Sequence, residues 1–218
     1  MPSEGFLHRY FLNNPGKPLH KWMHYFDIYE RHLERFRGSA PVMLEIGVAG
    51  GGSLPMWKDY LGPGAKVIGI DIEPGCKVHE AENIEVFIGS QDDPALIKQV
   101  LHKYPRIDIV LDDGSHLMSH QIRSFELIYE SVAPNGVYLV EDTYTCYWED
   151  YQGGLKRPGT FMEFVKDRLD DLNAAHTNGA LPVSTFTRST GAINCYDSVV
   201  VFERRPQGTR QAPLTKAL

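Results

Sequence analysis

The chain has 218 residues, of which 42% are hydrophobic, enough for the core of one large domain. Lys and Arg number 22 against 28 Asp and Glu, a net charge of −6, and no basic stripe offsets this excess, which argues against a nucleic acid partner. No apolar run approaches the roughly 20 residues of a membrane-spanning helix, and the N-terminus lacks a signal-peptide core. Because Cys76, Cys146 and Cys195 are widely spaced and odd in number, we expect a cytoplasmic protein without disulfides and without a membrane partner.

Residues 1–20 are polar and interrupted by prolines, which predicts an N-terminal arm. From Lys21 to Arg37, aromatic and apolar residues recur at three- and four-residue steps, which predicts a helix that stops at Gly38. We expect most of these aromatic side chains to pack in the core. Lys21 and Tyr25 are the exceptions, because they could reach over the edge of a sheet, and we count Tyr25 among the candidate cofactor contacts.

The next stretch predicts a strand, a glycine-rich turn and a helix. An apolar run from Val42 leads into a cluster of glycines, and a helical pattern covers Leu54 to Leu61. This arrangement lets the backbone approach a nucleotide closely, and no Lys-Ser/Thr pair follows that would indicate a P-loop. The residues that we expect to contribute to a cofactor site here are Glu45, Gly47, Ala49, Gly50 and Ser53.

Two further predicted strands complete this candidate cofactor site. Ala65 to Ile72 ends near Asp71, which lies 24 residues after Gly47. An acidic residue about 20 residues after such a turn typically binds the ribose hydroxyls, although a strand-end Asp can also cap a turn. Ile84 to Ile88 opens into a polar loop in which Gln91 and Asp92 are placed to contact an adenine edge, or are simply polar loop residues. A helix is predicted to start at Pro94.

A second cluster of polar residues follows two more apolar runs. The run from Ile107 ends in Asp112-Asp-Gly-Ser-His116, and the run from Gly136 ends in Glu141-Asp142. If the two runs are neighbouring parallel strands, their carboxyl ends meet at one edge of the sheet. The cluster then combines hard oxygen ligands, as magnesium prefers, with an imidazole able to accept a proton near neutral pH.

Each residue of this second cluster has a predicted role. Asp113, Glu141 and Asp142 are the candidate ligands of Mg2+, and His116 is the candidate general base. Asp112 is expected to face the cofactor or to cap the turn, and His120 is a less suitable base. The alternatives are solvated strand-end carboxylates and a hydrogen-bonded loop histidine.

The rest of the chain closes the predicted fold. We expect a helix from Ser119 to Val132, a mobile aromatic loop on the acceptor side from Tyr144 to Pro158, and a helix from Phe161 to Leu172. Val183–Arg188 and Ala192–Arg204 are predicted as a terminal antiparallel strand pair. The fold class is therefore α/β: a doubly wound, Rossmann-like, mostly parallel seven-stranded sheet with a C-terminal antiparallel hairpin. Residues 21–205 are predicted to form the single domain, and 206–218 a disordered tail.

Several of these motifs together resemble a known family. Glu45-Ile-Gly47 with Gly50-Gly-Gly52, followed by Asp71 and Gly89-Ser-Gln91, resembles the class I S-adenosylmethionine-dependent methyltransferases. Asp112-Asp-Gly-Ser-His116 with Glu141-Asp-Thr-Tyr-Thr-Cys-Tyr-Trp148 resembles more specifically the metal-dependent sugar O-methyltransferases of antibiotic biosynthesis, of the mycinamicin, macrocin and rhamnosyl type.

This resemblance implies S-adenosyl-L-methionine and Mg2+ as cofactors. It also implies that Asp113, Glu141 and Asp142 bind the metal and that His116 is the base. The expected partner is a small-molecule acceptor with a sugar or glycoside hydroxyl, with a vicinal diol as the metal-chelating group, and a homo-oligomer is allowed. The alternatives are a catechol-type aromatic O-methyltransferase, a cephalosporin-hydroxylase-like protein, and a binding module that retains the cofactor without turnover.

Overall fold

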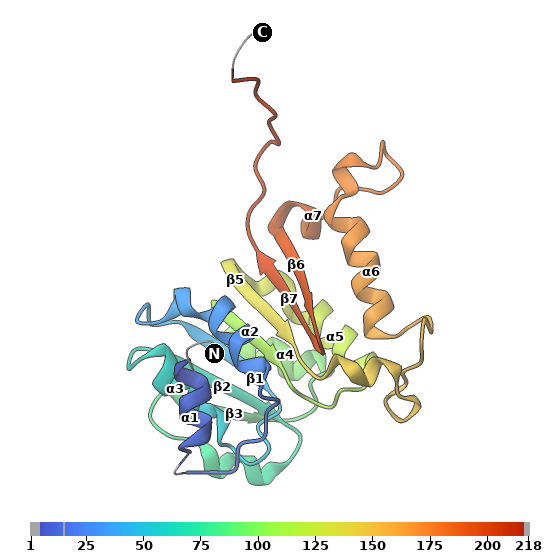
Figure 1. Cartoon of the computed structure of the whole chain (residues 1–218). Helices are drawn as coiled ribbons and strands as arrows, with labels where there is room; N and C mark the ends of the chain where they lie inside the picture. The colour runs from blue at the N-terminus through green and yellow to red at the C-terminus, as the bar shows by residue number, and fades with distance from the viewer. Residues whose placement is uncertain (1–4, 15, 216–218) are drawn as a thin grey trace.

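The computed structural model describes residues 5–14 and 16–215 (Figure 1). Within these residues a seven-stranded sheet has the order β3-β2-β1-β4-β5-β7-β6. Its first five strands run parallel, and the last two form an antiparallel hairpin on β5. The strands are β1 (Val42–Ile46), β2 (Lys66–Asp71), β3 (Ile84–Ile88), β4 (Ile107–Asp112), β5 (Val132–Val140), β6 (Thr190–Tyr196) and β7 (Val199–Arg204). The predicted fold class is confirmed.

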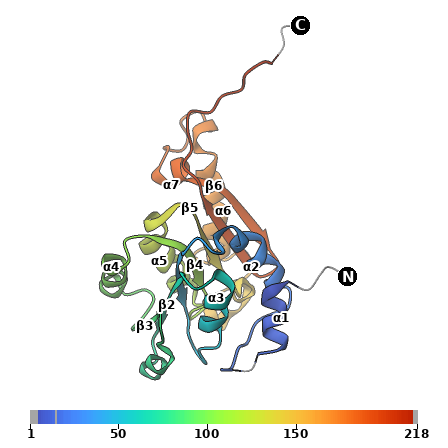
Figure 2. The same cartoon turned by 90° about the vertical axis from the view of Figure 1, so that its left-hand side faces the viewer.

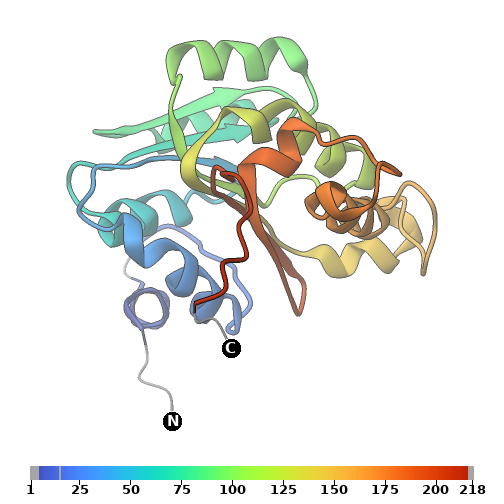
Figure 3. The same cartoon turned by 90° about the horizontal axis from the view of Figure 1, so that it is seen from above.

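Helices cover both faces of the sheet, as Figure 3 shows from above. One core cluster joins one face to α1 (Phe6–Leu12), α2 (Tyr25–Leu33) and α3 (Ser53–Leu61). A second cluster joins the other face to α4 (Pro94–Lys103), α5 (Met118–Ile128) and α6 (Phe161–Leu172). Successive residues of β4 serve the two clusters, because side chains alternate along a strand. All six residues of β4 are buried, as expected for a parallel strand covered on both faces.

The strand order places a crevice above the middle of the sheet. The chain leaves β1 toward β2 and β3 on one side, and β4 and β5 lie on the other side of β1. Ile46, the last residue of β1, pairs with Ile70 and with Asp112, and Asp112 pairs with Val140. The loops that follow these paired ends therefore begin side by side, at the position where doubly wound proteins bind ligands.

The structure differs from the sequence predictions at both ends of the domain. Within residues 1–20, Phe6–Leu12 form α1, and its Leu7 is fully buried against α2 and α3. The helix predicted from Lys21 begins only at Tyr25. The described part of the tail, through residue 215, contains neither helix nor strand and leads away from the domain (Figure 2).

The prediction of a strand at Val183–Arg188 is wrong. Thr185–Ser189 form the short helix α7, because the Ser184 hydroxyl accepts a hydrogen bond from Thr187 N–H and the Thr187 hydroxyl accepts one from Ser184 N–H. Such a reciprocal capping box satisfies the free N–H groups of a helix start. Both strands of the terminal hairpin consequently lie within Thr190–Arg204. No helix among the described residues is long and apolar enough to cross a membrane.

Candidate active site

A cavity lies over the carboxyl ends of β1, β2 and β3, where the sequence predicts a cofactor. We call it the cofactor cavity. Of the predicted cofactor residues, Gly47, Ala49, Asp71 and Gln91 line it. A second cavity, the acidic pocket, lies beside it and shares Gly47, Ala49, Asp113 and Gly114 with it. The other residues that line the acidic pocket are Pro18, Leu19, His20, Lys21, Val48, Gly50, Gly52, Ser53, His116 and Asp142.

The turn after β1 can be built only with glycine at position 47. Gly47 has a φ of +93°, and a Cβ atom there would lie 2.0 Å from the carbonyl oxygen of Asp113. The loops after β1 and β4 therefore touch through backbone atoms. Ala49 in the same turn also has a positive φ of 45°. This close approach leaves the cofactor cavity open above the turn.

Asp71 holds the glycine turn in place. Its Oδ2 accepts hydrogen bonds from Val48 N (2.8 Å) and Ala49 N (2.9 Å), and its Oδ1 accepts one from Glu73 N (2.9 Å). Burial alone would raise the pKa of Asp71, but these backbone donors outweigh it and lower the pKa. The carboxylate is thus ionised at the cavity wall and keeps further lone pairs for a ligand.

Glu45 lies beneath the turn and lines neither cavity. Its two oxygens accept hydrogen bonds from Ser53 Oγ (2.8 Å) and Trp57 Nε1 (3.0 Å), so the side chain ties β1 to the start of α3. Burial raises the pKa of Glu45. Glu45, although predicted to contact a cofactor, therefore supports the glycine turn through Ser53 and Trp57 and does not reach the cavity.

Asp112 and Gln91 form a buried pair that joins the loops after β3 and β4. Gln91 Nε2 donates to Asp112 Oδ1 at 3.0 Å, and Gln91 Oε1 accepts from Ser115 N at 2.8 Å. Ser124 Oγ also donates to Asp112 at 2.7 Å, and burial raises the pKa of Asp112. Of the two predicted roles of Asp112, the structure shows the cap of the turn, because Gly114 N donates to its Oδ1. Asp112 lines neither cavity.

The predicted cofactor residue Asp92 does not line the cofactor cavity, but it pairs with His120, which does. His120 lines the cavity, and its Nε2 lies 3.5 Å from Asp92 Oδ2. Its Nδ1 is within 3.0 Å of Ser115 Oγ. From the sequence, His120 is predicted only to be a less suitable base than His116. Its position in the first turn of α5, directly after the β4 loop, is the signal that would have placed it at the cavity.

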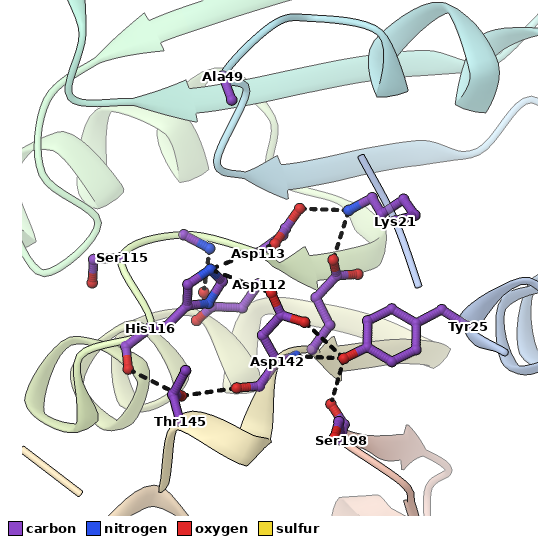
Figure 4. Close-up of polar contacts among 12 residues, drawn as sticks. Lys21, Tyr25, Ala49, Asp112, Asp113, Ser115, His116, Asp142, Thr145 and Ser198 are labelled. Atoms are coloured by element: carbon purple, nitrogen blue, oxygen red, sulfur yellow. Dashed lines mark hydrogen bonds and ion pairs between the residues drawn. The ribbon is translucent and has the colours of Figure 1, made fainter. Parts of the chain in front are cut away.

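Asp113, His116 and Asp142 meet in the acidic pocket (Figure 4). His116 Nε2 lies 3.8 Å from Asp113 Oδ1 and 3.6 Å from Asp142 Oδ2. One nitrogen or oxygen atom from each of the three residues lies within 4.8 Å of the others, a spacing that suits a divalent cation bound by the two carboxylates with the imidazole beside it. His116 and Asp142 both adopt left-handed backbone angles, φ +57° and +55°. Such strained residues cluster at functional sites, and here the strain turns both side chains toward Asp113.

Glu141 is not one of this trio, and its two oxygens are bound by two other groups. Its Oε1 accepts a hydrogen bond from Lys21 Nζ at 2.7 Å, and its Oε2 accepts one from the Tyr29 hydroxyl. Lys21 Nζ also lies 2.5 Å from Asp113 Oδ2, so its ammonium bridges two carboxylates. Tyr25 acts similarly on the neighbouring residue, donating to Asp142 Oδ1 at 2.7 Å, and lines neither cavity.

Burial shifts the pKa values of the carboxyl groups in this cluster. Burial and the charge of Asp113 raise the pKa of Glu141 to about 8. Burial also raises the pKa of Asp113 to about 6, although Lys21 acts in the opposite direction. For Lys21, burial would lower the pKa, but Asp113 and Glu141 raise it above its usual value. One ammonium thus lies between two carboxyl groups whose charged forms are disfavoured by burial, and a bound cation would favour those charged forms.

The comparisons agree with this geometry. No family model matches the chain. It is 34% identical over 187 residues to the 8-demethyl-8-alpha-L-rhamnosyl tetracenomycin-C 2'-O-methyltransferase of Streptomyces olivaceus, a match that covers 81% of this chain and 49% of that enzyme. It is 38% identical over 166 residues to the demethylmacrocin O-methyltransferase of Streptomyces fradiae, covering 70% of this chain and 41% of the relative.

A solved structure matches nearly the whole chain. It is the MycE methyltransferase from the mycinamycin biosynthetic pathway in complex with Mg, S-adenosylhomocysteine (SAH) and mycinamycin VI, with a TM-score of 0.81 and 28% identity. The match covers 97% of this chain and 55% of that one, so the chain spans about half the length of the relatives it matches. The chain is thus a relative of the sugar O-methyltransferases of antibiotic biosynthesis, and it has the fold of a class I methyltransferase.

Proposed function

We propose that this protein is an S-adenosylmethionine-dependent, magnesium-assisted O-methyltransferase that acts on a sugar hydroxyl of a glycosylated small molecule. The observation that carries the proposal is the convergence of Asp113, His116 and Asp142 in the acidic pocket, directly beside the cavity over the Gly47 turn. The similarity to rhamnosyl and macrocin O-methyltransferases supports the choice of a sugar as acceptor.

The cofactor cavity would hold the methyl donor. Backbone groups of the Gly47 turn approach the ligand because no Cβ intervenes, and Asp71 offers an ionised carboxylate to the ribose hydroxyls. Gln91 and Asp92 remain the proposed residues at the adenine end. The Gln91 amide binds Asp112 and Ser115, so it orders the cavity wall in addition to any contact with the ligand.

Asp113 and Asp142 are proposed to hold the metal, with Glu141 completing the predicted set. A bound divalent cation supplies the Lewis acidity that lowers the pKa of an acceptor hydroxyl. Tyr25 orients Asp142 by donating to its Oδ1, which leaves Oδ2 facing His116. Lys21 orients Asp113 in the same way.

His116 is proposed as the general base that accepts the acceptor's hydroxyl proton. It lines the acidic pocket, in the loop that follows β4. Its Nδ1 is buried without a hydrogen-bond partner among the described residues. The imidazole is therefore oriented by its backbone conformation and by the two carboxylates facing Nε2. Holding acceptor and donor in line provides much of the rate enhancement of such a transfer.

The test is methyl transfer from labelled S-adenosylmethionine to a methyl glycoside and, side by side, to a catechol. Methylation of the glycoside that is lost with EDTA and restored by Mg2+ is the expected result. Preferential methylation of the catechol would favour the aromatic alternative, which uses the same kind of metal ligands. Binding of SAH without turnover on either acceptor class would contradict the proposed activity.

The proposal also covers the compartment and the oligomeric state of the protein. All three cysteines are free, which supports a reducing compartment such as the cytoplasm. A homo-oligomer is also proposed, and sedimentation of the purified protein tests it.

A further inference from the structure

Three polar side chains contact one another in a row along one wall of the cofactor cavity. Ser115 and His120 line the cavity, and Ser115 Oγ lies 3.0 Å from His120 Nδ1. On the other side of the imidazole, His120 Nε2 lies 3.5 Å from Asp92 Oδ2. The carboxylate is therefore linked to the cavity through an imidazole and a hydroxyl, without lining the cavity itself. We call Asp92, His120 and Ser115 the hydroxyl relay.

Asp92 is held in place as an ionised carboxylate. Its Oδ1 accepts a hydrogen bond from the Ser90 hydroxyl at 2.5 Å, which leaves Oδ2 facing the imidazole. This hydrogen bond is the main reason why the pKa of Asp92 is lowered. An ionised carboxylate only accepts hydrogen bonds, so it favours the tautomer of neutral His120 that carries its proton on Nε2. His120 Nδ1 is then an acceptor.

This tautomer determines what the Ser115 hydroxyl offers to a ligand. A hydroxyl has one proton to donate and two lone pairs that accept. The proton is used by His120 Nδ1, and one lone pair accepts from Leu117 N at 3.3 Å. One lone pair remains, on a residue that is exposed and lines the cavity. Ser115 therefore presents an acceptor, and no donor, to a molecule bound at this end of the cavity.

The neighbouring side chains on this wall have the same polarity. Gln91 Nε2 donates to Asp112 at 3.0 and 3.2 Å and to Ser124 at 3.2 Å, so both of its protons are used. Gln91 Oε1 accepts from Ser115 N at 2.8 Å and keeps one lone pair. The Ser90 hydroxyl, which also lines the cavity, gives its proton to the carboxylate of the relay. The molecule that fits these side chains must itself supply the donor.

We infer that the hydroxyl relay selects the 6-aminopurine base of the methyl donor, with Ser115 Oγ accepting from the amino group and with Asp92 and His120 as positioning residues. This inference rests on the proposed function and names the residues that read the base. A 6-oxopurine would place a carbonyl oxygen opposite the same lone pair, and the acceptor would stay unpaired. The selection depends on a carboxylate that does not touch the ligand, which a purely steric fit of the base would not require.

The test compares SAH with S-inosyl-L-homocysteine, which carries a 6-oxo group in place of the 6-amino group. Calorimetric titration gives the Kd of each without metal, acceptor or turnover. We expect the wild type to bind SAH at least roughly tenfold more tightly, equivalent to about 1.4 kcal/mol. Ser115→Ala removes the acceptor, and His120→Ala frees the hydroxyl proton to donate. Each should reduce the ratio of the two Kd values by about fivefold, equivalent to one hydrogen bond of about 1 kcal/mol.

Asp92→Asn tests the relay at its outer end. An asparagine of the same shape can place an N–H on His120 Nε2, which moves the imidazole proton to Nδ1 and turns the Ser115 hydroxyl into a donor. The preference for SAH should fall by about fivefold or more, although the substituted residue does not reach the cavity. Asp93→Asn is the matched control, because it removes the same charge one residue away, where the side chain caps α4 by accepting from Ala95 N. It should keep the wild-type ratio.

Nitrogen-15 NMR of the imidazole reads the tautomer directly. Above neutral pH, the His120 signals, identified by their loss in His120→Ala, should show the proton on Nε2 in the wild type and on Nδ1 in Asp92→Asn. A proton on Nδ1 in the wild type would overturn the inference. A preference for SAH that is absent from the wild type, or that all three relay variants retain, would also overturn it while leaving the methyltransferase proposal intact. The expected preferences in a protein that methylates neither a glycoside nor a catechol would count against the proposed function alone.

Discussion

Lys21 Nζ lies 2.7 Å from Glu141 Oε1, so one oxygen of a predicted metal ligand is bound by a cation of the chain itself. The same ammonium reaches Asp113, so a cation supplied by the chain itself occupies the gap between two buried carboxylates. Glu141 and Asp142 are adjacent in the sequence, yet one faces Lys21 and Tyr29 and the other faces Tyr25 and His116.

Replacing this internal cation should make the fold depend on an external one. In Lys21→Met, Asp113 and Glu141 lose their buried partner, which should cost roughly 3 kcal/mol of unfolding free energy without metal. Added Mg2+ should then raise Tm more in the variant than in the wild type, because the metal stabilises the carboxylates that the ammonium no longer contacts. Thermal unfolding with and without Mg2+ measures both effects.

The control for this substitution is Lys77→Met, whose amino group pairs with exposed Glu80. It should change neither Tm nor its response to Mg2+ appreciably. An identical Mg2+ response in Lys21→Met and the wild type would show that Lys21 and the metal do not act on the same carboxylates.

The proposed base can be separated from cofactor binding. His116→Ala should reduce kcat by about 10²- to 10⁴-fold, the usual contribution of a general base, while the Kd for SAH stays within about twofold. Single-turnover rates measure the effect on the chemical step, and calorimetric titration with SAH measures the Kd. Full turnover in the variant would reassign the base, and His120→Ala is the comparison to make, because His120 lies at the cofactor cavity instead.

The two carboxylates that face His116 should control metal affinity. Asp113→Asn and Asp142→Asn should each weaken binding of Mn2+ by about tenfold or more, since each removes a charged oxygen ligand. Titration of Mn2+ followed by electron paramagnetic resonance gives the affinity without any need for turnover. Asp150→Asn, in the nearby loop, is expected to bind Mn2+ as the wild type does; unchanged affinity in both active-site variants would place the metal elsewhere.

The close contact under the glycine turn predicts a sharp difference between two glycines. Gly47→Ala should abolish measurable SAH binding, because its Cβ would overlap the Asp113 carbonyl and force the two loops apart. Gly75→Ala introduces the same methyl group where nothing lies within 4 Å, and it should bind SAH normally. Tight SAH binding by Gly47→Ala would show that the turn can open without loss of the cofactor cavity.

A polar network away from the site predicts a pH effect on stability. Glu203 accepts hydrogen bonds from His32 Nδ1 (2.6 Å) and Arg35 Nη2 (2.5 Å). Burial alone would raise the pKa of Glu203, but these partners outweigh it and lower the pKa below 4.5. Because the folded-state pKa is the lower one, the stabilisation is present above the unfolded-state pKa and is lost as the pH falls through the folded-state pKa.

Glu203→Gln should therefore lower the unfolding free energy by about 2 kcal/mol at pH 7, and the difference from the wild type should shrink as the solution becomes more acidic than about pH 4.5. Urea unfolding at several pH values measures this. Glu126→Gln, which removes only an exposed partner of Arg123, serves as the control. A difference that grows on acidification would mean that the pKa of Glu203 is raised.

The sequence by itself determined the parallel part of the sheet and the edge at which the candidate site was predicted. Five apolar runs that end in glycines or carboxylates predict parallel strands whose polar ends meet at one edge, so Gly47, Asp71 and Asp113 were predicted to lie there from their order alone. The likeness to sugar O-methyltransferases followed from the motifs around His116 and Asp142, because their spacing is local.

Only the tertiary structure decided which way neighbouring side chains face. From the sequence, Asp112 and Asp113 are already predicted to have different roles, but nothing local separates Glu141 from Asp142. The left-handed backbone at Asp142 and the arrival of Lys21 and Tyr29, more than a hundred residues away in the chain, do so. The strand predicted at Val183–Arg188 failed for a related reason, because a capping box at Ser184 competes with a β-branched composition. Long-range partners are set by tertiary packing, and a helix cap is set by hydrogen bonds at the helix start. The periodicity of apolar residues along the chain encodes neither of them.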